Sequence, residues 1–297
     1  MKDYRIAGHR IRVDYDGCAE TEALLPNLRP FLLNGETAQD EPVLTFTISP
    51  IPLHSAEDDA EIGRFDVGGC LHEVYRTQSG GYRFEIHDTT GHLCGRMVSN
   101  VDFSHCLAHA FPGTTPQRIY GLNNSLMMSF AFATATLDTV LIHASVIRCD
   151  GYGYLMTAPS GTGKSTHTRL WYDHIPGCDL MNDDNPIIRI MPDGTPIVFG
   201  SPWSGKTPCY RNISAPIGSI VRLHQRPKNT IRRMKPIEAF AELLPACSSM
   251  KWDARVYNGV CDSVTKFIQS CGIWELGCLP DADAAILCHD TIAKENH

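Results

Sequence analysis

The chain has 297 residues, of which 43% are apolar, and this length favours two domains with buried cores. Its formal net charge of -7 argues against a nucleic-acid-binding protein, because phosphate backbones are held by clustered Lys and Arg. The sequence has no run of about 18–20 apolar residues that would cross a membrane, and its start lacks the apolar core of a signal peptide, so we expect a cytoplasmic protein.

Residues 1–115 form short segments of alternating polar and apolar side chains separated by turn-forming residues, which predicts a β-rich domain. The expected strands cover residues 4–7, 9–13, 43–48, 81–86 and 92–98. The last two fit a hairpin with residues 88–91 at its tip. We expect the domain to end near residue 115, within the segment Pro112–Pro116.

Residues 116–297 are expected to form a second domain that mixes helices and strands. It begins with an apolar run that predicts a buried helix over 122–136 and a buried strand over 139–147. A strand over 153–157 then leads directly into a glycine-containing loop, and a helix over 164–172 follows. Further strands are expected over 186–191, 196–199, 217–223 and 273–276, and further helices over 236–244, 255–270 and 281–292.

The twelve cysteines are scattered from Cys18 to Cys288, and no Cys-x-x-Cys pair occurs among them. A long chain without an export signal is expected to keep its cysteines as reduced thiols. The lack of paired spacing also argues against a structural zinc site.

The glycine-containing loop Ala158-Pro159-Ser160-Gly161-Thr162-Gly163-Lys164-Ser165 has the pattern of a phosphate-binding loop. Small residues let backbone N–H groups converge on phosphate oxygens at the N-terminus of the following helix. We expect Lys164 to neutralise the β- and γ-phosphates, Ser165 to bind Mg²⁺ and Thr166 to support the α/β end. The predicted cofactors are therefore ATP and Mg²⁺, bound by Ser160, Gly161, Thr162, Gly163, Lys164, Ser165 and Thr166.

Two adjacent carboxylates, Asp183 and Asp184, follow Asn182 a short distance after the loop. Mg²⁺ prefers hard oxygen ligands, so one carboxylate is suited to hold the metal or its water. The other is suited to accept a proton from an attacking hydroxyl, a division of roles that phosphoryl transfer uses. The alternative interpretation is a solvated acidic turn.

Two further features leave functional and structural interpretations open. His143 lies in an apolar strand, where a hydrogen-bonded core histidine is the ordinary alternative to a functional one. The segment Gly200–Thr207 combines small residues with Lys206, as in a loop that brings a cation to a phosphate or substrate; an ordinary turn with an exposed lysine is the alternative.

In order and spacing, the segments His143–Ile147, Ala158–Thr166 and Asn182–Asp184 resemble the HPr kinase/phosphorylase family, whose fold is shared with phosphoenolpyruvate carboxykinases. The resemblance implies an α/β (α+β) fold in which a catalytic domain with a phosphate-binding loop follows the β-rich N-terminal domain. It implies that Asp184 is the base toward the acceptor hydroxyl, that Asp183 supports the metal with Ser165, and that His143 lies beside the transferred phosphate. More loosely, Arg226 would face the phosphate or substrate.

The chain also departs from that family. The family's metal-binding Glu after the Asp pair has no counterpart in Pro202–Lys206, and residues 1–115 do not resemble its N-terminal domain. We therefore predict an ATP-dependent phosphotransferase that moves the γ-phosphate to a hydroxyl of serine, a peptide or another small molecule. The alternatives are a carboxykinase-like lyase and a nucleotide-binding regulatory protein without transfer activity. The expected partner is the hydroxyl acceptor, and homo-oligomerisation is left open.

Overall fold

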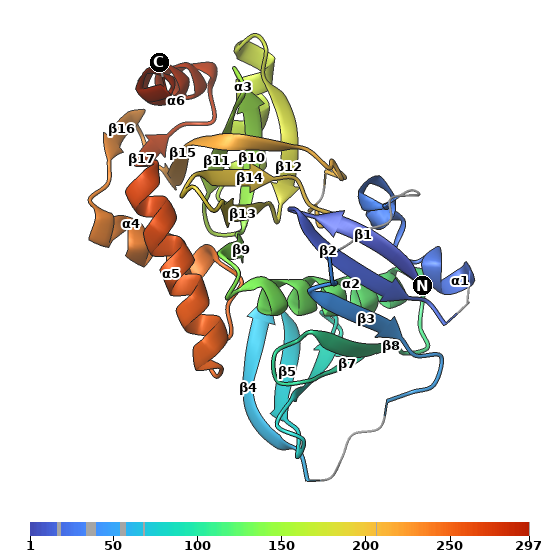
Figure 1. Cartoon of the computed structure of the whole chain (residues 1–297). Helices are drawn as coiled ribbons and strands as arrows, with labels where there is room; N and C mark the ends of the chain where they lie inside the picture. Colours follow the sequence, from blue (N-terminus) through green and yellow to red (C-terminus); the bar gives the residue numbers. More distant parts are fainter. Residues whose placement is uncertain (17–18, 34–39, 54–57, 68, 206, 297) are drawn as a thin grey trace. The chain divides into compact units, whose positions relative to one another are not determined.

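The protein is a mixed α/β structure with two sheets and several helices (Figure 1). The computed structural model describes residues 1–16, 19–33, 40–53, 58–67, 69–205 and 207–296. The chain divides into two compact units, one made of Met1–Thr134 with Met250–Ala254 and the other of Ala135–Ser249 with Arg255–His297. This division differs from the boundary expected near residue 115.

The first unit contains an eight-stranded sheet in the order β1-β2-β3-β8-β7-β6-β5-β4. Its strands are β1 (Lys2–Ile6), β2 (His9–Asp14), β3 (Leu44–Ile48), β4 (Ala60–Val67), β5 (Cys70–Arg76), β6 (Tyr82–His87), β7 (Leu93–Ser99) and β8 (His105–Ala110). The predicted hairpin is confirmed, because β6 pairs antiparallel with β7. Strands β4, β5 and β8 were not predicted. Two short helical segments, α1 (Ala19–Glu22) and η1 (Pro26–Phe31), follow β2.

Helix α2 (Thr115–Thr134) packs against this sheet, chiefly against β7 and β8, which is why it belongs to the first unit. It begins seven residues before the predicted start at 122. A polar cap explains the early start: the Gln117 backbone N–H donates to the Thr114 hydroxyl, and the Gln117 side-chain oxygen accepts from the Thr114 N–H. Such reciprocal bonds satisfy N–H groups at a helix start.

Helix α2 approaches β7 closely at Gly121, where a side chain would collide with the strand backbone. A Cβ at Gly121 would lie 2.4 Å from the carbonyl oxygen of Cys94. We expect Gly121→Ala to destabilise the first unit by about 1–3 kcal/mol, because the backbone of β7 would have to shift to make room for the methyl group. This loss should outweigh the gain from the higher helix propensity of alanine. Urea unfolding measures the loss. Asn124→Ala, on the same helix but partly exposed, is the control, and an unchanged or raised stability of Gly121→Ala would contradict the close packing.

The second unit contains a nine-stranded sheet whose main path runs β12-β10-β11-β15-β14-β13-β9. Its strands are β9 (Thr139–Leu141), β10 (Ala144–Cys149), β11 (Tyr152–Thr157), β12 (Asp179–Asp184), β13 (Ile187–Ile190), β14 (Pro196–Phe199), β15 (Ser214–Gln225), β16 (Thr230–Arg233) and β17 (Gly272–Cys278). Strand β15 is nearly twice as long as predicted, since it pairs in parallel with β11 and β17 and antiparallel with β14.

The single strand predicted over 139–147 is wrong, because the chain changes partners at its middle. Strand β9 pairs with β13, whereas β10 pairs with β11 and β12. His143 lies at the break, and its backbone N–H donates to the carbonyl of Ala246 instead of joining a ladder. The apolar pattern continues through the break because both strands are buried.

Helices α3 (Lys164–His174) and α6 (Ala282–Ile292) contact each other, and α3 also contacts β10, β11 and β12. Together they bury an apolar cluster that includes Trp171, Met156, Val221 and Cys288. Helices α4 (Pro236–Leu243) and α5 (Ala254–Ser270) and the 3-10 segments η2 (Leu244–Ala246) and η3 (Ala293–Asn296) complete the chain. Within the described ranges, every helix is too short or too polar to cross a lipid bilayer.

The expectation of reduced thiols is wrong for one pair, because Cys149 and Cys178 form a disulfide. Strands β10 and β12 pair Arg148 with Asp179, so Cys149, the next residue of β10, faces Cys178, the residue just before β12. Their Cα atoms lie 4.4 Å apart, a separation that antiparallel neighbours reach and that a disulfide can bridge. Separation in sequence, 29 residues, gives no hint of this pairing.

Candidate functional site

The glycine-containing loop connects strand β11 to helix α3, as the sequence predicted. Gly161 and Gly163 have φ angles of 78° and 112°, which strain residues with a side chain. Gly163 directly precedes α3 in the left-handed conformation. The loop therefore turns sharply into the N-terminus of the helix, where unpaired N–H groups and the helix dipole favour an anion.

Lys164 folds back over this loop. Its side chain is 8% exposed, and its Nζ donates to the carbonyl oxygen of Ala158 at 3.0 Å. Burial lowers the pKa of Lys164, and the nearby carboxylates of Asp184 and Asp183 oppose that shift. The lysine is thus a buried cation held next to the loop, close to two acidic side chains.

Ser165 and Asp183, from separate elements, are in direct contact. The Ser165 hydroxyl, in the first turn of α3, donates to the Asp183 carboxylate, with distances of 3.0 Å to Oδ1 and 3.2 Å to Oδ2. Asp183 is 5% exposed and lies near the end of β12. A hydroxyl and a carboxylate at this spacing offer hard oxygen ligands of the kind that Mg²⁺ prefers.

Asp184 pairs with His143 across the ends of β10 and β12, with 3.3 Å between His143 Nε2 and Asp184 Oδ1. Burial raises the pKa of Asp184, although His143 and Lys164 act in the opposite direction. Burial and the charge of Lys164 lower the pKa of His143. At neutral pH the imidazole is therefore expected to be uncharged, and its Nε2–H can donate to the carboxylate.

The backbone of Asp184 is strained, with φ at 127° in a residue that carries a side chain. The segment after β14 holds it there. Gly205 N–H donates to the Asp183 carbonyl at 2.6 Å, the Ser204 hydroxyl donates to the same carbonyl at 2.9 Å, and Asn182 donates to the carbonyl of Trp203 at 3.2 Å. The loop predicted to bring a cation to the site thus fixes the backbone of the Asp pair.

A cavity of about 330 Å³ adjoins the loop, and the end of β15 forms its other wall. It is lined by Pro159, Ser160, Gly161, Thr162, Arg222, Leu223, His224, Gln225 and Arg226. Gln225 donates to the Thr162 carbonyl at 3.1 Å and so ties the two walls together. The volume of the cavity is at the lower end for small-ligand sites, and two arginines line it.

Among the predicted residues, Lys164, Ser165, Asp183, Asp184 and His143 interact within one cluster. Ser160, Gly161, Thr162 and Arg226 line the cavity, and Thr166 is exposed in the first turn of α3. Lys206 lies outside the described residues.

Two residues of the site were given no role in the sequence-based prediction. Arg222 lines the cavity, forms an ion pair with Glu242 at 3.0 Å, and its charge lowers the pKa values of Lys164 and His143. The side-chain amide of Asn182 donates to the carbonyl of Trp203 and so positions the segment that follows β14. The available signal for Arg222 was a charged residue within the mostly apolar strand predicted over 217–223.

Helix α3 is anchored behind the loop by His167, which is 3% exposed. The Trp171 Nε1–H donates to His167 Nε2 at 3.2 Å, which requires a neutral imidazole, and burial lowers the pKa of His167 to about 4. Because the unfolded chain binds this proton from pH 6.5 downward, stability is expected to fall by about 3 kcal/mol between pH 6.5 and pH 4.

Urea unfolding at several pH values measures this effect. His167→Gln should remove this part of the pH dependence, and His174→Gln, exposed at the end of the same helix, should retain it. A wild-type slope in His167→Gln would contradict the assignment.

No family model matches the chain, and no curated protein matches it. Among solved structures, the chain is similar to the Hpr(Ser) kinase/phosphatase from Coxiella burnetii, with 13% sequence identity and a TM-score of 0.31. The match covers 52% of this chain and 95% of the Coxiella chain. A similarity of this size assigns neither a family nor an activity to the protein.

Proposed function

We propose that the second unit is a nucleotide-binding domain like that of HPr kinases and phosphoenolpyruvate carboxykinases, and that it transfers the γ-phosphate of ATP to a hydroxyl. The observation that carries this proposal is the hydrogen bond between Ser165 and Asp183. It joins the first turn after a phosphate-binding loop to a pair of carboxylates, which is the combination that phosphoryl transfer requires.

The residues present fit Mg²⁺, since the Ser165 hydroxyl and the Asp183 carboxylate are hard oxygen donors already in contact. When bound there, Mg²⁺ would neutralise negative charge on the β- and γ-phosphates. Lys164 would exchange the Ala158 carbonyl for a phosphate oxygen, and the loop from Ser160 to Gly163 would surround the phosphates.

Asp184 is the base in this proposal. It accepts the proton of the acceptor hydroxyl while the acceptor oxygen bonds to the γ-phosphorus and the bond from that phosphorus to the β–γ bridging oxygen breaks, which releases ADP. Burial raises the pKa of this carboxylate and so makes it a better proton acceptor than an exposed Asp. His143 orients the carboxylate through its Nε2.

The cavity beside the loop supports anion binding at the same end of the sheet. Arg222 and Arg226 line it opposite Ser160–Thr162. Paired guanidinium groups near a phosphate loop suit the phosphates of the nucleotide or a negatively charged acceptor.

The test is incubation of the whole chain with γ-labelled ATP and Mg²⁺ in the presence of serine, serine peptides or a small-metabolite extract. Label in an acceptor that depends on Asp184 supports the proposal. Tight nucleotide binding without transfer would indicate a regulatory protein instead, and nucleotide-dependent decarboxylation of oxaloacetate would indicate a carboxykinase-like lyase.

A further inference from the structure

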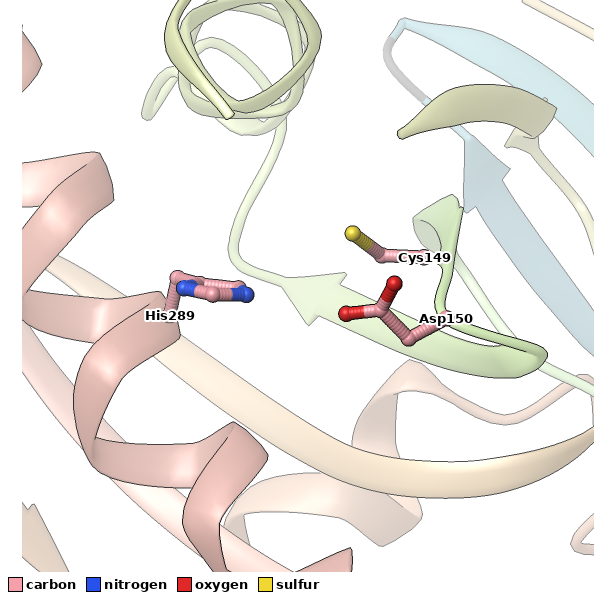
Figure 2. Close-up of side chains that lie close together, drawn as sticks. All are labelled: Cys149, Asp150 and His289. Carbon is pink, nitrogen blue, oxygen red and sulfur yellow. The ribbon is translucent and has the colours of Figure 1, made fainter. Parts of the chain in front are cut away.

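A second group of reactive side chains lies at the opposite end of strand β10 from His143. Cys149 ends β10, Asp150 follows it in the turn to β11, and His289 comes from helix α6 (Figure 2). One ligand atom from each of these residues lies within 4.8 Å of the others. Cys149 follows His143 by six positions of extended chain, about 20 Å, so the group is distinct from the proposed catalytic cluster.

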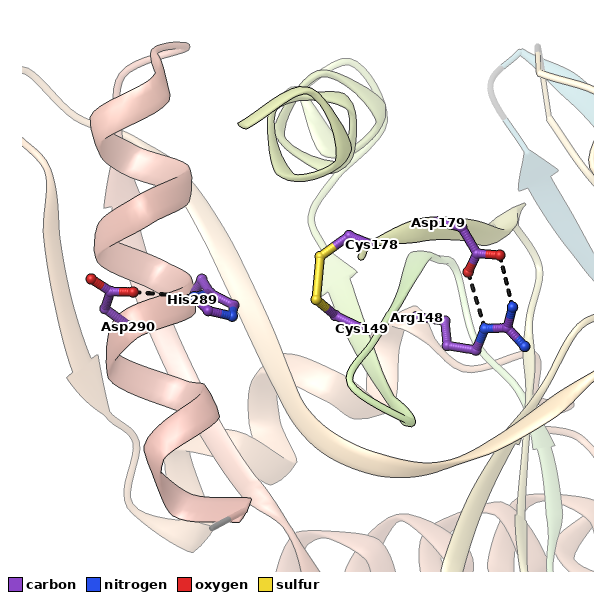
Figure 3. The surroundings of a disulfide bond; sticks show 6 residues. All are labelled: Arg148, Cys149, Cys178, Asp179, His289 and Asp290. Atoms are coloured by element: carbon purple, nitrogen blue, oxygen red, sulfur yellow. Dashed lines mark hydrogen bonds and ion pairs between the residues drawn. A yellow bond between two sulfur atoms is a disulfide. The ribbon is translucent and has the colours of Figure 1, made fainter. Parts of the chain in front are cut away.

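Cys178 lies next to this group. It is bonded to Cys149 across β10 and β12, and Figure 3 shows His289 on the side of the disulfide away from the Arg148–Asp179 ion pair. Arg148 contacts Asp179 at 2.8 Å, and so holds the two strands in the register that brings the cysteines together. We expect this pairing to keep the two sulfur atoms adjacent when the disulfide is reduced.

The turn and the helix aim the other two ligands. Asp150 and Gly151 both have positive φ, 50° and 83°, which is the two-residue hairpin turn that keeps Asp150 beside the end of β10. His289 Nδ1 lies 3.1 Å from Asp290 Oδ1, and Trp171 packs edge-on against the imidazole at 5.4 Å. If Nδ1 donates to Asp290, the lone pair of Nε2 is left for a metal, as in many metal-binding histidines.

We propose that Cys149, Cys178, Asp150 and His289 bind a zinc ion when the disulfide is reduced. Two thiolates, an imidazole and a carboxylate form a tetrahedral donor set that zinc accepts. In the oxidised protein the two sulfur atoms are bonded to each other, and Asp150 and His289 are the ligands that remain. The site is therefore switched by redox state: oxidised protein holds a disulfide, and reduced protein holds the metal.

The chemistry of the switch is thiol–disulfide exchange. A dithiol reductant supplies two electrons and two protons, so that the S–S bond breaks, two thiols form and the reductant becomes a disulfide. Each cysteine then releases its proton when its sulfur binds zinc. Reducing compartments supply such dithiols.

Another group of ligand-type side chains is a poorer metal site. Glu73, Glu85 and His87 also cluster in the first unit. However, Glu85 already forms ion pairs with Arg83 and Arg96, which neutralise the charge that a cation would need.

Cobalt(II), a spectroscopic substitute for zinc, distinguishes these sites in the 297-residue chain. Titrated into protein reduced with a phosphine, cobalt should give thiolate-to-metal charge-transfer bands and the visible spectrum of a tetrahedral ion, and zinc should displace it. Oxidised protein should give neither. Zinc should also raise the thermal unfolding midpoint of reduced protein and leave that of oxidised protein unchanged.

Matched variants locate the site. Cys178→Ser and His289→Ala should each abolish the charge-transfer spectrum or weaken cobalt binding more than tenfold, and Asp290→Ala should weaken it about 10- to 100-fold by releasing His289. Cys261→Ser, which removes a free and partly buried thiol elsewhere, should bind as wild type does. The proposal is overturned if folded, reduced wild type binds no cobalt, binds it without thiolate bands, or binds it equally well after Cys178→Ser.

Discussion

Asp184→Asn is expected to lower phosphoryl transfer by about 10²- to 10⁴-fold while nucleotide affinity stays within a few-fold of wild type. Asparagine keeps the shape of the side chain, can still accept from His143 Nε2, and tolerates the positive φ of this position. What it lacks is the ability to take the proton of the acceptor hydroxyl. Single-turnover transfer of labelled phosphate, with binding measured separately by calorimetry, separates the two effects.

The pH profile gives an independent check on the same carboxylate. The pKa of Asp184 is raised, and the base acts when deprotonated, so activity should fall with decreasing pH at a value above that of an ordinary aspartate. Asp173→Asn makes the same charge change on the exposed face of α3 and should leave both rate and profile unchanged. Full transfer by Asp184→Asn would show that the proposed base is wrong.

Local signals in the sequence predicted much of the second unit. The order of strand, loop and helix at residues 152–174 follows from glycines, a buried apolar strand and an amphipathic helix, all of which are encoded within a few residues. Strand β12 was missed because its sequence, Asp179–Asp184, is mostly polar and is held by pairing with β10. Pairing partners that are distant in sequence leave no periodic pattern.

The same limit explains why the sequence grouped the residues of one side-chain cluster but not those of the other. The contact between Ser165 and Asp183 links residues whose types suggested related roles, so the sequence could group them before the structure did. The Cys149–Cys178 pair depends on the register of two strands, and the approach of His289 depends on how α6 packs. Neither is visible in spacing, which explains why the sequence favoured free thiols and argued against a structural zinc site.

Lys164→Met is expected to weaken Mg²⁺-dependent ATP binding about 100-fold, or about 3 kcal/mol, because a charge-assisted hydrogen bond to phosphate is lost in a buried position. Methionine is close to lysine in length and suits a position that is 8% exposed. The cost to folding should be small, since the side chain makes one hydrogen bond, to Ala158, in the described structure. Calorimetry at matched ionic strength measures the affinity, and thermal unfolding checks that the variant is folded.

Lys294→Met removes the same charge from an exposed position in the same unit and serves as the control for long-range electrostatics. If both variants lose affinity equally, the effect belongs to net charge and not to the loop. If Lys164→Met binds ATP as wild type does, the phosphates do not contact the loop lysine. Binding would then have to depend on Arg222 and Arg226, which line the other wall of the cavity, and the assignment of the loop to the β- and γ-phosphates would be wrong.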